Sequence, residues 1–522
     1  MALMKRCPQC NRVEADDDLT FCRVDGTRLV TGSLASDSPA TAILSPATRG
    51  EAFTKLLQQV PSIAVLPFAN MSNDAENEFF CDGLAEDILN ALTRVEGLRV
   101  AARTSAFSFK GKGTTVGEIG RVLNVNSVLE GSVRKSSNRL RIHVQLVNTS
   151  DGYHLWSERY DREMRDIFDV QDEITLAVVD ALKVKLFGKE KAAVLKRHTD
   201  NAEAYQLYLK GSYHWFKATP EGIRMSRNFF QRAIDLDPTY ALGYVGLGSY
   251  YGLSSAVGLM PPEEGWPRLE AALTRALELD DTLPEVHNGL AALKMFFYRD
   301  WAGAEKEIKR AIQLDPNYAE VHVLNCFYLV AIGQIDEAIA EGKRALELDP
   351  LSARNIRYLG NWFYYARRYD EAIRQYHDAL ELDPHNPMVH DHLGDAYEQK
   401  GLHSEAVAEW EKAMTLAGDD KLAAILHDSY ARGGFTAALR AVAEKRLEHR
   451  NDRSERGEYV PTIEYARAYV RLGDKEQALL WLGKAFEERN MFPLYFNSDP
   501  FYDGLRSDPR FEDLMRRVRL PP

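Results

Sequence analysis

The chain has 522 residues, of which 45% are hydrophobic and 27% are charged, and its formal net charge is −12. This length predicts about three or four folded units, and the hydrophobic fraction is typical of globular packing. The acidic balance argues against broad nucleic-acid binding, because such binding depends on clustered Lys and Arg. No stretch approaches the ~18–20 consecutive apolar residues of a membrane span, and the amino terminus shows no signal-peptide pattern, so we expect a cytoplasmic protein.

Residues 1–30 contain three of the five cysteines, arranged as two short half-motifs. Cys7 and Cys10 form a Cys-x-x-Cys pair, and Cys22 and Asp25 repeat that spacing further along. The segment resembles a zinc ribbon, in which two such pairs surround one zinc ion. Asp25 stands where the ribbon has its fourth Cys, and a carboxylate can also ligate zinc. The four side chains therefore predict a structural zinc site, and the alternative is a relic that no longer holds metal.

Residues 31–60 are rich in Ser, Ala, Thr and Pro, which predicts a linker. Residues 61–190 then alternate between strand and helix patterns. Apolar residues at 140, 142, 144 and 146, for example, alternate strictly with polar ones, as in a half-buried strand. The order of elements predicts a small α/β domain. Its expected strands are 62–70, 98–102, 128–134, 139–146 and 153–160, and its expected helices are 82–95, 115–123 and 166–187.

Several segments of this domain resemble the TolB amino-terminal-like domain: Ile63–Ser72, Phe80–Leu89, Arg103–Gly111, Leu129–Arg134 and Gly152–Asp161. In bacterial regulators that domain commonly precedes tetratricopeptide repeats and often accompanies a winged helix, a nucleotide cyclase or a kinase. We find no pattern of those three in the sequence. The titratable residues of 61–190 form no recognised catalytic spacing, so we expect no enzyme, and an unfamiliar site in this domain is the alternative.

The most regular feature of the chain is a Leu-Asp-Pro motif that ends at Pro316, Pro350 and Pro384, with a period of 34 residues. A fixed period of this length predicts a solenoid of stacked helix pairs. Small residues such as Gly360 would let paired helices approach closely. A glycine between helices, such as Gly333, suits a positive φ.

The repeats resemble tetratricopeptide repeats in their period and in their Leu-Gly, Tyr, Ala and Pro positions. They predict an α-helical solenoid over 200–490 and a carboxyl-terminal cap over 491–522, in which Phe511 and Leu514 would seal the last apolar face. The expected units are 203–238, 239–281, 282–316, 317–350, 351–384 and 385–418, followed by a degenerate unit at 419–450 and a late one at 458–490.

This resemblance implies a concave groove that binds a peptide or a helix. Arg357 and Asn361 lie four residues apart and partly resemble the clamp by which some of these domains hold a peptide carboxylate. A solvated face adapted to another partner is the alternative. The expected groove residues are Phe296, Phe297, Val323, Phe327, Arg354, Arg357, Asn361, Tyr364, Tyr365, Asp391 and Asp395.

Three histidines near one repeat boundary, His385, His390 and His392, suggest either a metal site or surface histidines, and we favour the second. The leading hypothesis is a non-enzymatic bacterial scaffold for other proteins or peptides, used in signalling or regulation. The alternative is a transcription-linked regulator whose ribbon contacts nucleic acid through its local Lys and Arg. The acidic charge of the chain opposes this alternative.

Overall fold

The structure is a computed structural model, which describes residues 60–72, 74, 77–136, 138–186, 191–192, 194–216, 219–489 and 495–518 and three short strands near the amino terminus. These strands are β1 (Lys5–Arg6), β2 (Val13–Glu14) and β3 (Val30–Thr31), which pair antiparallel in the order β2-β1-β3. The chain divides into two compact units, Met1–Gln59 and Val60–Pro522. The candidate zinc ligands, Cys7, Cys10, Cys22 and Asp25, lie outside the described residues.

The second unit begins with the expected α/β domain, whose strands form one mixed sheet in the order β6-β4-β7-β8-β9, with β5 paired to β7. Strands β4, β5 and β6 pair parallel to their neighbours, whereas β7, β8 and β9 form an antiparallel meander. The strands are β4 (Ser62–Val65), β5 (Ala69–Asn70), β6 (Arg99–Val100), β7 (Ser127–Ser136), β8 (Arg139–Asn148) and β9 (His154–Glu163). The helices are α2 (Glu78–Thr93), α3 (Arg103–Phe107), α4 (Val116–Leu123) and α5 (Ile167–Ala181).

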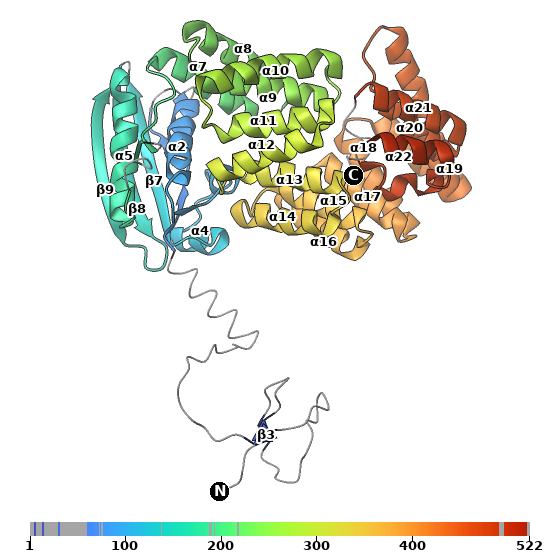
Figure 1. The fold of residues 1–522 in the computed structure, drawn as a ribbon, viewed down its shortest axis with the longest axis horizontal. Helices are drawn as coiled ribbons and strands as arrows, with labels where there is room; N and C mark the ends of the chain where they lie inside the picture. Colours follow the sequence, from blue (N-terminus) through green and yellow to red (C-terminus); the bar gives the residue numbers. More distant parts are fainter. Residues whose placement is uncertain are drawn as a thin grey trace. The chain divides into compact units, whose positions relative to one another are not determined.

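Helices cover both faces of this sheet. Helices α2 and α5 pack on one face, where the alternating apolar side chains of β8 (Leu140, Ile142, Val144 and Leu146) are all buried. Helix α4 packs on the other face through Ile119 and Leu123, against apolar residues of β4 and β7. Figure 1 shows α2 and α5 beside the strands. The period-two pattern of β8 therefore decides which side chains face the helices.

A series of antiparallel helix hairpins follows the small domain (Figure 1). The helices begin and end close to the expected unit boundaries. They are α7 (Ala202–Phe216), α8 (Pro220–Leu236), α9 (Ala241–Ala256), α10 (Pro262–Leu279), α11 (Pro284–Leu293) with the π-helical turn η3 (Lys294–Tyr298), α12 (Trp301–Leu314), α13 (Ala319–Ala331), α14 (Ile335–Leu348), α15 (Ala353–Tyr365), α16 (Tyr369–Leu382), α17 (Pro387–Gln399) and α18 (His403–Leu416).

The last part of the chain departs from the regular period. Helix α19 (Asp420–Glu455) contains a break at Gly434, where φ is 75° and ψ is −169°. The hairpin of α20 (Thr462–Leu472) and α21 (Lys475–Glu487) forms the late unit. A 3-10 turn, η5 (Pro500–Leu505), and α22 (Pro509–Val518) end the described chain.

Small residues at fixed repeat positions allow the paired helices to approach closely. A Cβ atom at Gly360 would lie 2.5 Å from Cε1 of Tyr376, and one at Gly394 would lie 2.6 Å from Cδ1 of Trp410. Both bulky partners lie on the second helix of the same hairpin and are buried. Gly333 adopts a φ of 82° in the turn between α13 and α14, as its position predicts.

The small domain and the repeats share a polar junction. Asp349, in the turn after α14, accepts hydrogen bonds from the backbone N–H of Ser105 (3.0 Å) and from its hydroxyl (2.6 Å). The same hydroxyl oxygen accepts a bond from the Leu351 N–H at 2.8 Å. At a second point, Asp87 of α2 accepts bonds from Gln171 of α5 (2.9 Å) and from the hydroxyl of Tyr205 on α7. Buried polar groups thus fix the domain on two parts of the array.

Candidate binding groove

The expected groove residues lie on the first helices of four successive hairpins, α11 with η3, α13, α15 and α17. Arg354 is the one exposed side chain among these described residues. The others are buried or half-buried. Much of what covers them is the carboxyl-terminal part of the same chain. The groove is therefore not the open trough that the repeat pattern predicts.

The aromatic middle of the groove holds Tyr495. Its ring stacks on Tyr365 with an interplanar angle of 12° and a centroid distance of 6.1 Å. It also contacts Phe327 at a centroid distance of 5.8 Å. Close by, Arg367 forms a 2.8 Å ion pair with Asp503. The segment from Tyr495 to Leu505 thus contacts α13 and α15 through aromatic stacking, and it contacts the turn after α15 through one charge pair.

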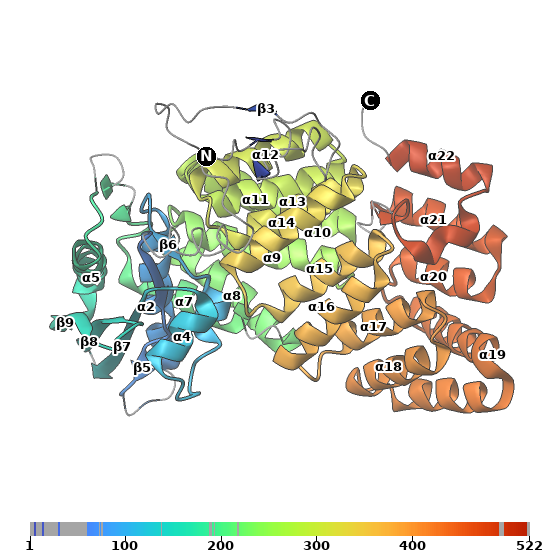
Figure 2. The same ribbon diagram turned by 90° about the horizontal axis from the view of Figure 1, so that it is seen from below.

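Both ends of the groove contact the hairpin of α20 and α21. At the early end, Arg489 donates a 2.6 Å hydrogen bond to the carbonyl oxygen of Phe297 and lies over its ring. At the late end, Arg471 of α20 pairs with Asp395 at 3.4 Å and also with Glu398 of α17. Figure 2 shows α20 and α21 next to the array, near α17.

The remaining groove residues are engaged within the array. Arg354 pairs with Glu320, and Arg357 is only 7% exposed and lies over the ring of Tyr358. Asn361 accepts a 2.9 Å hydrogen bond from the hydroxyl of Tyr376. Arg357 and Asn361, the two residues of the expected carboxylate clamp, thus both contact other residues of the repeats.

Three further groove residues, Phe296, Tyr364 and Val323, stabilise the array itself. Phe296 and Phe327 meet edge to face at 6.4 Å, and Tyr364 packs between Tyr365 and Tyr369. Val323 is buried. The last groove residue, Asp391, lines a cavity beside Asp395 at the late end. Phe511 and Leu514 of α22 are buried, as expected of a cap. The preceding residues 495–505 also contact the groove, where Tyr495 packs on Phe327 and Tyr365.

Two features of the sequence, apart from the repeat pattern, indicate that the carboxyl-terminal residues pack on the groove. Residues 495–502 include Tyr495, Phe496, Phe501 and Tyr502, which is a high aromatic content for a tail. Arg467 and Arg471 lie four residues apart on α20, so both face the same side of that helix. Read together, these features would have indicated a segment that packs on an aromatic and acidic surface.

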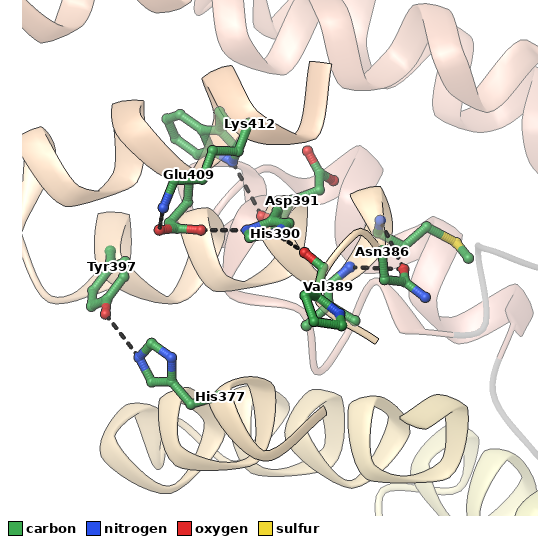
Figure 3. Close-up of polar contacts among 11 residues, drawn as sticks. His377, Asn386, Val389, His390, Asp391, Tyr397, Glu409 and Lys412 are labelled. Atoms are coloured by element: carbon green, nitrogen blue, oxygen red, sulfur yellow. Dashed lines mark hydrogen bonds and ion pairs between the residues drawn. The ribbon is translucent and has the colours of Figure 1, made fainter. Parts of the chain in front are cut away.

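A histidine at one repeat position bridges the two helices of a hairpin in three units. In the example of Figure 3, Nδ1 of His390 lies 2.5 Å from Oε2 of Glu409, and Nε2 lies 3.2 Å from the carbonyl oxygen of Pro384. The same arrangement joins His287 to Glu307 at 2.7 Å and His322 to Glu341 at 2.8 Å.

These contacts correct the interpretation of the histidines near the repeat boundary. His390 is buried rather than on the surface, whereas His385 is exposed and His392 is half-buried. The described residues contain no group of three or more His, Cys, Asp or Glu side chains that could hold a metal ion. Within the same residues, no helix is long and apolar enough to cross a membrane.

Several carboxylates at these interfaces have raised pKa values, Asp395 and Asp87 among them. Burial, together with the nearby charge of Asp391, raises the pKa of Asp395 to about 8. Burial also raises the pKa of Asp87, at the junction with the small domain, to about 7, against the opposing effect of the Tyr205 hydrogen bond.

Comparisons with known families match two parts of the chain. Residues 360–401 match the family described as TPR repeat, and residues 389–420 match the tetratricopeptide repeat family. Residues 58–177 match the family described as HilA/YgeH-like transcriptional regulator, second domain. The chain thus carries tetratricopeptide repeats, which confirms that prediction, after a small domain similar to part of a transcriptional regulator.

A curated relative and several solved structures are also similar. The relative is "Putative adenylate cyclase 3" of Rhizobium meliloti (strain 1021), which is 43% identical over 187 residues, or 36% of this chain. The chain spans about a third (32%) of the length of that relative. YrrB, described as a TPR protein with an unusual peptide-binding site, is 22% identical with a TM-score of 0.26, and covers 37% of this chain and 95% of its own. A thermophilic TPR protein of Thermus thermophilus, TTC0263, is 19% identical with a TM-score of 0.32, over 37% of this chain and 98% of its own.

Proposed function

We propose that this chain is a non-enzymatic regulatory scaffold that binds a polypeptide segment on the concave face of its repeats. Two findings support a regulatory role. The small domain matches part of a transcriptional regulator, and the curated relative is named as a cyclase, an enzyme class used in signalling. Tetratricopeptide repeats support a partner that is a protein or a peptide.

The observation that carries this proposal is that the groove already contacts a polypeptide, namely residues 495–505 of the same chain. Tyr495 stacks on Tyr365, and Asp503 pairs with Arg367. Stacking of an aromatic anchor with a flanking charge pair is a common mode of peptide recognition. A partner with an aromatic residue followed by an acidic one would use the same contacts, and it would compete with the carboxyl-terminal segment.

This proposal can be tested with the full chain and a fluorescent peptide of residues 495–508. Removal of the internal cover by Tyr495→Ala with Asp503→Ala should increase the affinity for this peptide about ten-fold, because one aromatic contact and one ion pair no longer compete. Fluorescence anisotropy measures the affinity. The matched control is Asp513→Ala on α22, whose carboxylate is 58% exposed and pairs with Arg516. Equal peptide binding by the double variant and the control would contradict the proposal.

A second candidate function is a transcription-linked regulator, which the match of residues 58–177 favours. In this proposal the amino-terminal ribbon contacts nucleic acid, and Cys7, Cys10, Cys22 and Asp25 hold a structural zinc ion. The full chain should then bind duplex DNA at low salt and contain one zinc ion by elemental analysis, and Cys10→Ser should abolish both. Binding of DNA that Cys10→Ser leaves intact would exclude the ribbon as the contact.

The small domain contributes a second contact or a sensing surface in either proposal, in keeping with its resemblance to the TolB amino-terminal-like domain. Its junction with the repeats supports this role, because Asp349 and Ser105 join the two parts through buried hydrogen bonds. A ligand or partner of the small domain could therefore influence the repeats mechanically. We further propose that the protein acts in the cytoplasm.

A further inference from the structure

Four arginines surround a cavity near the carboxyl-terminal end of the repeats. The cavity has a volume of about 70 Å³ and lies among α17, α18, α19, α20 and η5. Its apolar wall includes Trp410 and Phe501. The charged residues that line it are Arg446, Arg450, Arg467, Arg471, Asp391 and Asp395.

Two of the four arginines have donors that no described residue accepts from. Arg471 pairs with Asp395 and Glu398. Arg450 bonds Glu464 through Nε at 2.9 Å, but its Nη1 is buried without a hydrogen-bond partner in the described part of the chain. Arg446 has no ion pair or hydrogen bond to another described residue, and its side chain lines the cavity while part of it stays exposed. Guanidinium groups in such surroundings are suited to bind an oxyanion.

The pKa values of Arg446 and Asp395 agree with an anion site. Burial lowers the pKa of Arg446, and the charges of Arg450, Arg467 and Arg471 lower it further, against the opposing effect of Asp391. Burial, and then the charge of Asp391, raise the pKa of Asp395 to about 8, against the opposing charges of Arg471 and Arg467. A bound anion would offset the repulsion between Arg446 and the other three arginines.

Aromatic rings hold two of the arginines in place. The guanidinium carbon of Arg467 and that of Arg471 each lie 4.7 Å from the centroid of Phe501, and Arg471 also lies 5.2 Å from the centroid of Trp410. These contacts limit the rotamers of both side chains. Arginines that are fixed before binding lose less conformational entropy when a ligand arrives.

We propose that this cavity is a binding site for a small oxyanion, either inorganic phosphate or the phosphate or carboxylate group of a small metabolite. A water molecule needs roughly 10–15 Å³ on the same scale, so the cavity holds a group the size of about five water molecules. That size fits a phosphate group and excludes a folded partner. Tyr495 itself does not line the cavity, although Phe501 of the same segment does.

The test uses the full chain and isothermal titration calorimetry with inorganic phosphate, phenyl phosphate and acetate as probes. We expect at least one probe to bind below ~1 mM. Arg446→Gln should weaken binding about ten-fold, because it removes one charge-assisted contact. Arg440→Gln, an exposed residue of the same helix that does not line the cavity, is the matched control and should bind as the wild type.

The three probes also distinguish the sources of the anion. Tighter binding of phenyl phosphate than of inorganic phosphate would indicate the phosphate group of a metabolite, tighter binding of inorganic phosphate would indicate the free ion, and binding of acetate alone would indicate a carboxylate. Arg450→Gln is a second variant, which should also weaken binding. The proposal is overturned if no probe gives heat at ~10 mM, or if both cavity variants bind as tightly as Arg440→Gln.

Discussion

The histidine–glutamate bridge between α11 and α12 leads to a quantitative prediction. Oε2 of Glu307 lies 2.7 Å from Nδ1 of His287, and Oε1 lies 2.7 Å from Nζ of Lys294. The Glu307 side chain is 13% exposed. The hydrogen bond from His287, and then that from Lys294, lower the pKa of Glu307 to about 2, although burial opposes the shift. Loss of this carboxylate should therefore destabilise the hairpin.

The magnitude follows from the shift of the pKa. Glu307 moves from 4.5 to about 2 on folding, and each pKa unit corresponds to about 1.4 kcal/mol, so the ionised carboxylate contributes about 3 kcal/mol at neutral pH. Because the folded pKa is depressed, this contribution is present above pH ~4.5 and is lost as the pH falls through ~2. Glu307→Gln should cost about 2–3 kcal/mol at pH 7 and clearly less at pH 3.

Hydrogen exchange of the amides in α11 and α12 is the appropriate measurement, because repeat arrays can unfold unit by unit. The matched control is Glu305→Gln on the same helix. Glu305 is 45% exposed and pairs with the exposed Lys309, so its loss should change the opening free energy by less than ~0.5 kcal/mol. The reasoning is refuted if both variants lose equal protection, or if the effect of Glu307→Gln is the same at pH 7 and pH 3.

Two further predictions concern helix packing and the domain junction. Gly360→Ala should destabilise by about 1–3 kcal/mol, because the new methyl group would meet the buried Tyr376 ring. Gly483→Ala, with no atom within 4 Å of the new Cβ, should instead stabilise α21 by up to ~1 kcal/mol. If thermal denaturation shows that the two variants shift the melting temperature in the same direction, the packing described for Gly360 is contradicted. The raised pKa of Asp87, about 7, means that its contribution to stability is present below pH ~4 and is lost as the pH rises through ~7. In urea denaturation, Asp87→Asn should therefore be more stable than the wild type at pH 8.5 by about 1–2 kcal/mol, with no gain at pH 4. A variant that is less stable at pH 8.5 would contradict the raised pKa of Asp87.

Local sequence patterns predict the secondary structure of the described chain well. The alternation of β8 and the 34-residue spacing of the Leu-Asp-Pro motif both depend on residues close in the chain, and the hairpins begin and end near the expected boundaries. The groove residues were placed on the right helices for the same reason. Their accessibility was not predictable, because it depends on Tyr495 and Arg471. Arg471 lies 76 residues from Asp395, and Tyr495 lies still further along the chain from Tyr365 and Phe327.

The sequence by itself determined the repeats, the order of strands and helices in the small domain, and the faces on which apolar side chains gather. These properties follow from periodicity, which is local. Only the tertiary structure decided that Asp349 docks on Ser105, that the tail covers the groove and that four arginines meet around one cavity. Such contacts join side chains that are distant in the chain, and they are set by how the hairpins stack rather than by any pattern within one of them.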